Sequence, residues 1–150
     1  MRRAIALSLE NVRSNNGGPF GAVVVKAGQI VGEGTNQVLA RNDPSAHAEV
    51  VAIREACRRL NGFQLTDCEI YSSCEPCPMC MGLIYWARPM RVYYANTAAD
   101  AASIGFDDDF IYHELARSPQ KRSLKMEQMM RDEALIAFGE WDKKPDKVRY

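Results

Sequence analysis

The stretch EIYSSCEPCPMCMGLIYWARPMRVYYA, residues 69–95, decides the fold class. Residues 69–73 predict a short strand, residues 77–88 an apolar helix, and residues 91–95 a second strand. A strand, a helix and a strand in this order form a β-α-β unit, and the two strands of such a unit run parallel. The stretch therefore predicts an α/β fold.

A hairpin and a helix are predicted upstream of this stretch. Residues 22–26 are rich in Val, and residues 29–34 follow them across the turn Ala27-Gly28, which is typical of two hairpin strands. A helix then runs from Ser45 to about Leu60 and leads into the strand at 69–73, so that β-α-β occurs twice. This order predicts a sheet with an antiparallel hairpin and parallel pairs, covered by helices on both faces.

The chain begins with a predicted amphipathic helix. Ile5, Leu9 and Val12 recur at i, i+4 and i+7, and charged residues surround them. This spacing makes Ile5, Leu9 and Val12 the apolar face of the helix.

Beyond Ala98 the patterns are weaker. They predict a short helix over residues 99–104, an acidic turn at residues 107–109, a helix over residues 132–141 and an extended tail over residues 143–150. A length of 150 residues fits one domain, and no linker or internal repeat divides the chain. We therefore predict a single domain over residues 1–150.

Composition excludes several classes of protein. Apolar residues make up 47% of the chain and charged residues 25%, which is typical of globular domains. Nineteen basic residues balance nineteen acidic ones, so the strongly basic surface that favours nucleic-acid binding is missing. The longest aliphatic run, Ala22 to Val25, is far too short to cross a bilayer. We expect a cytoplasmic protein whose partners include neither a membrane nor a nucleic acid.

The cysteines indicate a metal site. Their number, five, is odd, and three of them fall within residues 74–80, which favours metal binding over a disulfide framework. Cys77 and Cys80 lie at i, i+3 where a helix begins, so both sulfurs can meet one ion. His47, at the start of another helix, supplies a third ligand. One imidazole and two thiolates leave the fourth position of a tetrahedral zinc ion to water, as in catalytic sites.

Glu49 is the candidate base of this site. It lies two positions after His47, about 200° further round a helix, so it is not a ligand on the same side. From the helix tip it can reach the metal-bound water and pass a proton to a substrate nitrogen. The alternative is a closed site with Cys74 as fourth ligand, which would make the protein a zinc-stabilised binding module.

Three stretches carry a further signal: GGPFGA at 17–22, NDPSAHAEV at 42–50 and SCEPCPMC at 73–80. They resemble the cytidine-deaminase superfamily of zinc-dependent nucleobase deaminases. The H-x-E and P-C-x-x-C patterns in the last two are typical of this superfamily. Within it, IYWARP at 84–89, GFDD at 105–108 and the terminal Tyr150 are most similar to bacterial guanine deaminases. The resemblance implies a three-layer α/β/α fold with a mixed central sheet.

The resemblance also implies an activity and its central residues. His47, Cys77 and Cys80 would hold one Zn²⁺ together with a catalytic water, and Glu49 would shuttle protons. The reaction would be hydrolytic deamination of guanine to xanthine and ammonia, in purine catabolism or salvage.

Five residues would surround the base, again by resemblance. Phe20 would pack on the ring, Asn36 would hydrogen-bond the purine, and the backbone N–H of Ala48 would approach the carbon under attack. Asp108 would act as a second acid near the amine that leaves, and Tyr150 would close the pocket. The superfamily usually forms dimers, in some members with exchange of the C-terminal segment, so a homodimer is implied.

Several alternatives stay open at this point. A tRNA-specific adenosine deaminase shares the zinc motifs, and the basic residues between 143 and 149 suit it, whereas zero net charge favours a small base. Isocytosine, guanosine and cytosine are alternative substrates. Asp107 and Asp109 compete with Asp108 for the place beside the substrate.

Overall fold

The computed structural model describes residues 1–106 and 108–149, which pack as two compact units. The first unit covers residues 1–111 and the second begins at Tyr112. That the whole chain forms one domain stays a prediction.

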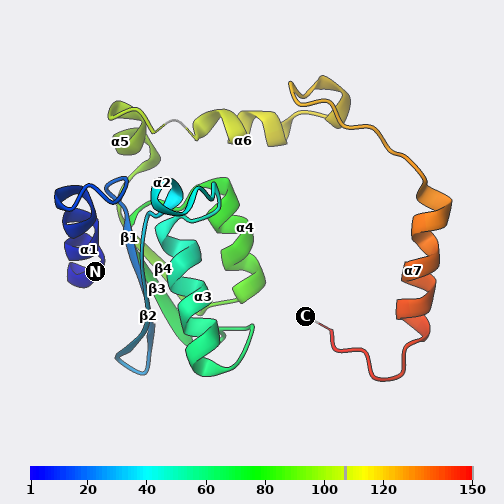
Figure 1. Ribbon diagram of the computed structural model, residues 1–150, viewed down its shortest axis with the longest axis horizontal. Coiled ribbons are helices and arrows are strands. Elements are labelled where there is room, and N and C mark those ends of the chain that lie inside the picture. The colour runs from blue at the N-terminus through cyan, green and yellow to red at the C-terminus, as the bar shows by residue number, and fades with distance from the viewer. Residues whose placement is uncertain (107, 150) are drawn as a thin grey trace. The chain divides into compact units, whose positions relative to one another are not determined.

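A four-stranded sheet forms the centre of the first unit, in the order β2-β1-β3-β4 (Figure 1). Its strands are β1 Gly21–Lys26, β2 Gln29–Thr35, β3 Cys68–Cys74 and β4 Arg91–Asn96. β1 pairs antiparallel with both β2 and β3, and β3 pairs parallel with β4. The predicted mixed sheet is therefore confirmed. Because β1 lies between β2 and β3, the first β-α-β unit yields no hydrogen-bonded parallel pair among the described strands.

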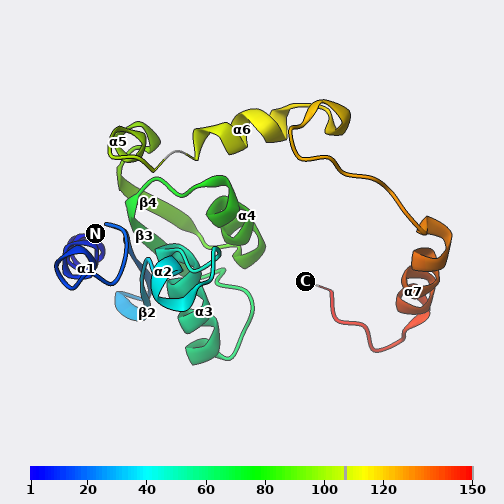
Figure 2. The same cartoon turned by 45° about the horizontal axis from the view of Figure 1, so that its top comes forward.

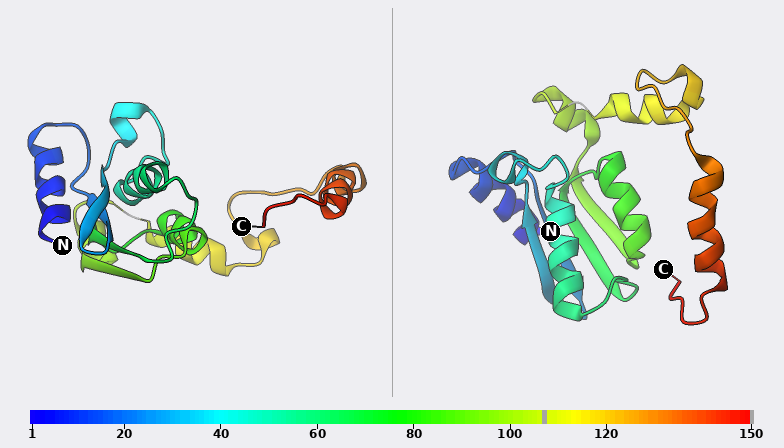
Figure 3. Two further views of the ribbon diagram at one scale, coloured as in Figure 1. Left: turned by 90° about the horizontal axis from the view of Figure 1, so that it is seen from below. Right: turned by 45° about the vertical axis from the view of Figure 1, so that its right-hand side comes forward.

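Helices cover both faces of this sheet, as Figures 1 and 2 show. α1 (Arg2–Arg13) lies on one face, and α3 (Ala48–Leu60) and α4 (Pro78–Ala87) lie on the other (Figure 3). Two short helices, α2 (Val38–Arg41) and α5 (Ala98–Ser103), complete the unit up to the start of α6. The three-layer α/β/α fold is thereby confirmed.

The face of α1 that packs on the sheet differs from the predicted one. Ile5, Leu9 and Val12 are 39%, 47% and 46% exposed. The buried residues are Ala4, Leu7, Ser8 and Asn11. A Cβ atom at Gly21 would lie 2.3 Å from the carbonyl oxygen of Ala4, so the helix approaches β1 closely. Such an approach selects the small residues of α1, which a hydrophobicity pattern does not favour.

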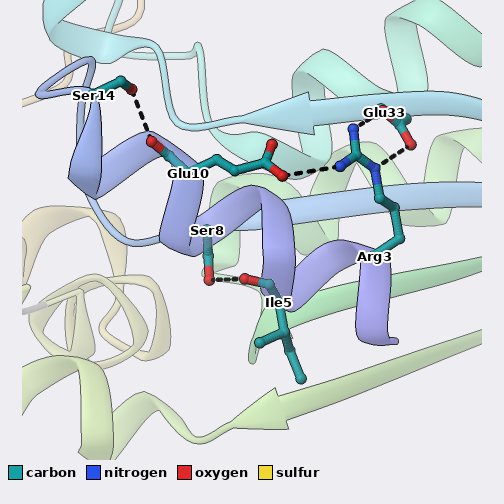
Figure 4. A network of polar contacts seen from close by, with 6 residues as sticks. All are labelled: Arg3, Ile5, Ser8, Glu10, Ser14 and Glu33. Carbon is teal, nitrogen blue, oxygen red and sulfur yellow. Dashed lines mark hydrogen bonds and ion pairs between the residues drawn. The ribbon is translucent and has the colours of Figure 1, made fainter.

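Polar contacts fix α1 to the sheet edge (Figure 4). The Arg3 guanidinium donates two hydrogen bonds of 2.8 Å to the Glu33 carboxylate on β2 and one of 3.2 Å to Glu10. The bond from Arg3 lowers the pKa of Glu33, against the opposing effect of burial. Paired guanidinium-to-carboxylate bonds add geometric specificity, so Arg3 sets how α1 lies against β2.

On the opposite face of the sheet, the backbone of α3 lies in close contact with β2 at Gly34. A Cβ atom at Gly34 would lie 2.1 Å from the carbonyl oxygen of Ala48 and 2.6 Å from the backbone nitrogen of Ala52. Ile53 and Ile70 are almost completely buried between the two layers. Close packing therefore holds the first turn of α3, which carries the predicted site, directly against β2.

The second unit contains most of α6 (Asp109–Ala116), the 3-10 turn Pro119–Lys121 and α7 (Arg131–Lys143). α7 confirms the predicted helix, whereas α6 was not predicted, because Asp109 begins a helix instead of ending a turn. Lys143 is still helical, so the non-helical tail begins at Lys144. None of the described residues 112–149 is buried, and no described helix is both long and apolar enough to cross a membrane.

Candidate metal centre and substrate pocket

The three predicted metal ligands lie together where α3 and α4 begin. His47 and Cys77 are the N-caps of these helices, and both have extended backbone angles that turn their side chains toward each other's helix. The Nδ1 atom of His47 lies 3.5 Å from the Cys77 sulfur and 3.6 Å from the Cys80 sulfur. All three ligand atoms lie within 4.8 Å of one another. The fold thus joins two motifs that are about thirty residues apart.

These distances suit zinc. A tetrahedral ion with Zn–N near 2.0 Å and Zn–S near 2.3 Å separates its nitrogen and sulfur ligands by about 3.6 Å. The His47 to Cys77 and His47 to Cys80 distances match this separation. Cys74 is not a member of the metal-ligand group found among the described residues, and its thiol donates instead to the Thr97 carbonyl at 3.5 Å. The arrangement therefore favours three protein ligands with a fourth position left for water.

The electrostatics of the ligands also favour a cation. The hydrogen bond from the Cys80 thiol, assisted by His47 and opposed by burial, lowers the pKa of Cys77 to about 4. The same bond and burial raise the pKa of Cys80, and the bond to Cys77 raises the pKa of His47. Helix N-termini at both motifs further stabilise thiolate. Zinc binds both sulfurs as thiolates, so binding of the cation is coupled to the release of protons.

Glu49 lies beneath this group, in the first turn of α3, and is only 6% exposed. Its Oε1 accepts a hydrogen bond of 2.9 Å from the Ser72 hydroxyl, and its Oε2 lies 3.5 Å from the Cys80 sulfur. Burial, the largest effect, raises its pKa. A carboxylate with a raised pKa beside a metal-bound water is suited to accept a proton and return it.

A cavity of about 390 Å³ opens onto the ligands and Glu49. Phe20, Asn36 and Asp108, three of the predicted substrate residues, line it together with His47 and Glu49. Its size lies within the range of pockets for small molecules. The structure thus brings the predicted metal and substrate residues to one place.

Each substrate residue offers a different contact. The Asn36 Oδ1 accepts a hydrogen bond from the Val38 backbone at 3.3 Å, so its amide NH₂ is available as a donor. The Phe20 ring meets the Phe106 ring edge to face, with centroids 4.8 Å apart. Ala48 is the first residue of α3, so its backbone N–H has no acceptor within the helix. Asp107 and Tyr150 lie outside the described residues.

Sequence reasoning assigned no role to several residues of the site, among them Phe106, Ser72, Val38 and Leu39. Phe106 lines the cavity against Phe20, and the signal for it was its place in the GFDD stretch, beside the acidic residues. Ser72 contacts Glu49 across 23 residues of sequence. Its signal was a hydroxyl side chain inside a strand that is otherwise buried, because a buried hydroxyl needs a partner.

Comparison with known proteins agrees with this geometry. The sequence profile described as "Cytidine and deoxycytidylate deaminase zinc-binding region" matches residues 1–96. Guanine deaminase of Bacillus subtilis is 51% identical over 150 residues, which is all of this chain and 96% of that protein. A tRNA-specific adenosine deaminase of Aquifex aeolicus is 46% identical over 77 residues, 51% of each chain.

Solved structures are similar as well. The X-ray structure of the Bacillus subtilis guanine deaminase superposes with a TM-score of 0.96 over 99% of this chain and 95% of that one. A guanine deaminase structure from Nitrosomonas europaea superposes with a TM-score of 0.68 at 28% identity, over 91% of this chain and 69% of that one.

Proposed function

Because the chain belongs to the cytidine and deoxycytidylate deaminase family, we propose that it hydrolyses guanine to xanthine and ammonia. One observation carries the proposal: Glu49 and two of the three zinc ligands, His47 and Cys77, line a cavity that Asn36 and Asp108 also line. The similarity to guanine deaminase extends over the whole chain, whereas that to the Aquifex tRNA deaminase covers about half. This difference in coverage favours guanine as the substrate over an adenine base within an RNA loop.

A zinc ion held by His47, Cys77 and Cys80 would supply a polarised water as the nucleophile for C2 of guanine. Glu49 takes one proton from this water as the C2–O bond forms and gives it to a ring nitrogen. Glu49 then takes the remaining proton from the new C2 hydroxyl and passes it to the amine, so that the C2–N bond breaks as the C2=O bond forms; Asp108 can relay this proton beside the departing amine. One water is consumed, and xanthine and ammonia are released.

The remaining residues bind and orient the purine. The Asn36 NH₂ donates to an acceptor on the purine edge, and the Asp108 carboxylate accepts from its amino or ring N–H groups. Phe20 packs on the ring, and the Ala48 N–H lies near the carbon under attack. By resemblance to the superfamily, Tyr150 would close the pocket and exclude water from the reacting atoms.

A panel of substrates tests this assignment. Ammonia release by the zinc-loaded protein is measured with guanine, isocytosine, cytosine, guanosine and a tRNA anticodon stem-loop. Release from guanine at the highest kcat/KM is expected. Activity on the stem-loop with none on guanine would replace the proposal with adenosine deamination in tRNA.

We also propose that the protein works in the cytoplasm as a homodimer that exchanges its C-terminal segment. The support is that the second unit buries no described side chain, while Ile136 and Phe138 are 63% and 74% exposed. Apolar side chains gain free energy when a partner covers them. Light scattering of the full chain at micromolar concentration should give the mass of a dimer. A monomer that retains full activity would contradict this proposal.

A further inference from the structure

Besides its contact with Cys80, the Glu49 carboxylate has a buried hydrogen bond to Ser72, on the strand that leads to the zinc ligands. Ser72 lies on β3, five residues before Cys77, and is 2% exposed. Its hydroxyl lies 2.9 Å from Oε1 of Glu49, in a buried environment where water has little access. Because the Glu49 side chain is itself 6% exposed, a lost bond at Oε1 has no ready replacement.

The two carboxylate oxygens of Glu49 therefore have different surroundings. Oε1 is held by Ser72, on the side of the sheet, while Oε2 faces the sulfur of Cys80 and hence the metal group. Rotation of the carboxylate about its terminal bond would break the contact at Oε1. Oε1 is thus anchored by the strand, and Oε2 lies on the side of the metal ligands.

Given the proposed deamination, we propose that Ser72 is a positioning residue, which anchors Oε1 of Glu49 so that Oε2 alone carries the proton. When Oε2 takes the proton, a water O–H bond breaks and an Oε2–H bond forms. When the ring nitrogen is protonated, the Oε2–H bond breaks and an N–H bond forms. The Ser72 hydroxyl donates to Oε1 throughout, since Oε1 is an acceptor in both the ionised and the protonated carboxyl group.

The neighbouring Ser73 provides a matched control. It is also buried, at 3% exposed, and its hydroxyl accepts a hydrogen bond of 3.0 Å from the Gly21 backbone. Successive residues of a strand face opposite sides of the sheet, so Ser73 points away from Glu49. Ser72→Ala and Ser73→Ala therefore remove the same group from the same strand, but only the first touches the site.

The experiment compares steady-state kinetics of zinc-loaded variants. We expect Ser72→Ala to lower kcat by about tenfold to a hundredfold, the usual effect of removing a group that orients a catalytic side chain, with KM changed by less than about twofold. Ser72→Thr should restore most of the rate, and Ser72→Val, which has the shape of Thr without the hydroxyl, should not. Zinc content and melting temperature are recorded for each, and the Thr and Val pair decides the question if Ser72→Ala does not fold.

The decisive comparison is a double variant, in which Ser72→Ala is combined with Glu49→Gln. There Ser72→Ala should reduce the residual rate by less than about twofold, because the proton-carrying oxygen is already lost. Full additivity, an unchanged rate in Ser72→Ala, or an equal loss in Ser73→Ala would overturn the inference. The proposed function is tested separately by the wild-type rate on guanine. The role of Ser72 is tested by the ratio of variant rate to wild-type rate, and this ratio is measured on whichever base of the panel the wild type deaminates.

Discussion

The Oε2 atom of Glu49 lies 3.5 Å from the sulfur of Cys80, although 31 residues separate them. The contact exists because α3 follows β2 and the short helix α2, α4 follows β3, and both α3 and α4 begin at the same end of the sheet. Their N-termini bring a carboxylate and two thiols to one point, where the positive ends of the helix dipoles favour negative charge. This end of the sheet thereby places a carboxylate beside a group of metal ligands.

The ligand set predicts which cysteines are needed for metal. Replacing His47, Cys77 or Cys80 by Ala should abolish stoichiometric zinc and lower the melting temperature, because metal binding is coupled to folding. Cys74→Ser should retain one zinc per chain, since the Cys74 thiol contacts the Thr97 carbonyl instead. Elemental analysis of each purified variant measures this. Loss of zinc from Cys74→Ser would favour a closed four-ligand site.

The contact between β2 and α3 predicts a large cost for one methyl group. Gly34→Ala should lower the free energy of unfolding by about 1–3 kcal/mol or more, because its Cβ would overlap the Ala48 carbonyl. Gly82→Ala is the control, since a Cβ there meets nothing within 4 Å and Ala favours the helix by about 1 kcal/mol. Urea unfolding measures both. Equal stability of the two variants would show that α3 moves away at little cost.

The Arg3–Glu33 pair predicts a stability that depends on pH. Arg3 lowers the folded pKa of Glu33 below its ordinary value of 4.5, so the pair stabilises the folded state above that pH. The contribution is lost as the pH falls through the lowered folded pKa. Glu33→Gln should cost about 0.5–1 kcal/mol at pH 7, since water screens this partly exposed pair, and much less near pH 3. A cost that stays constant across this range would contradict the assignment.

Removal of the C-terminal tail is expected to change the rate of turnover without changing the stability of the fold. Deleting residues 147–150 should leave zinc content and melting temperature nearly unchanged, because no described residue of the tail is buried. Guanine turnover should fall sharply if the tail closes the pocket. Steady-state assays with guanine and guanosine measure this. A wild-type rate in the deletion variant would remove Tyr150 from the site.

The local patterns were sufficient for the four strands, for α1, α3, α4 and α5 and for the metal motifs, because these depend on residues close in sequence. The one-turn helix α2 was not predicted. The buried face of α1 was mispredicted, since the close contact with Gly21 turns Ala4, Leu7 and Ser8 toward the sheet in place of Ile5, Leu9 and Val12. The roles of Ser72 and Phe106 were not predicted, because they come from partners that only the folded chain brings near. α6 had no clear period and was missed for that reason.

The central claim is that Glu49 transfers protons during guanine hydrolysis at the zinc site. Its most direct test is the rate of ammonia release from guanine by zinc-loaded Glu49→Gln, measured beside the wild type. The amide keeps the volume of the side chain but cannot accept the proton, so turnover should fall by at least about a hundredfold with zinc and melting temperature retained. Turnover near that of the wild type, with one zinc per chain, would contradict the claim.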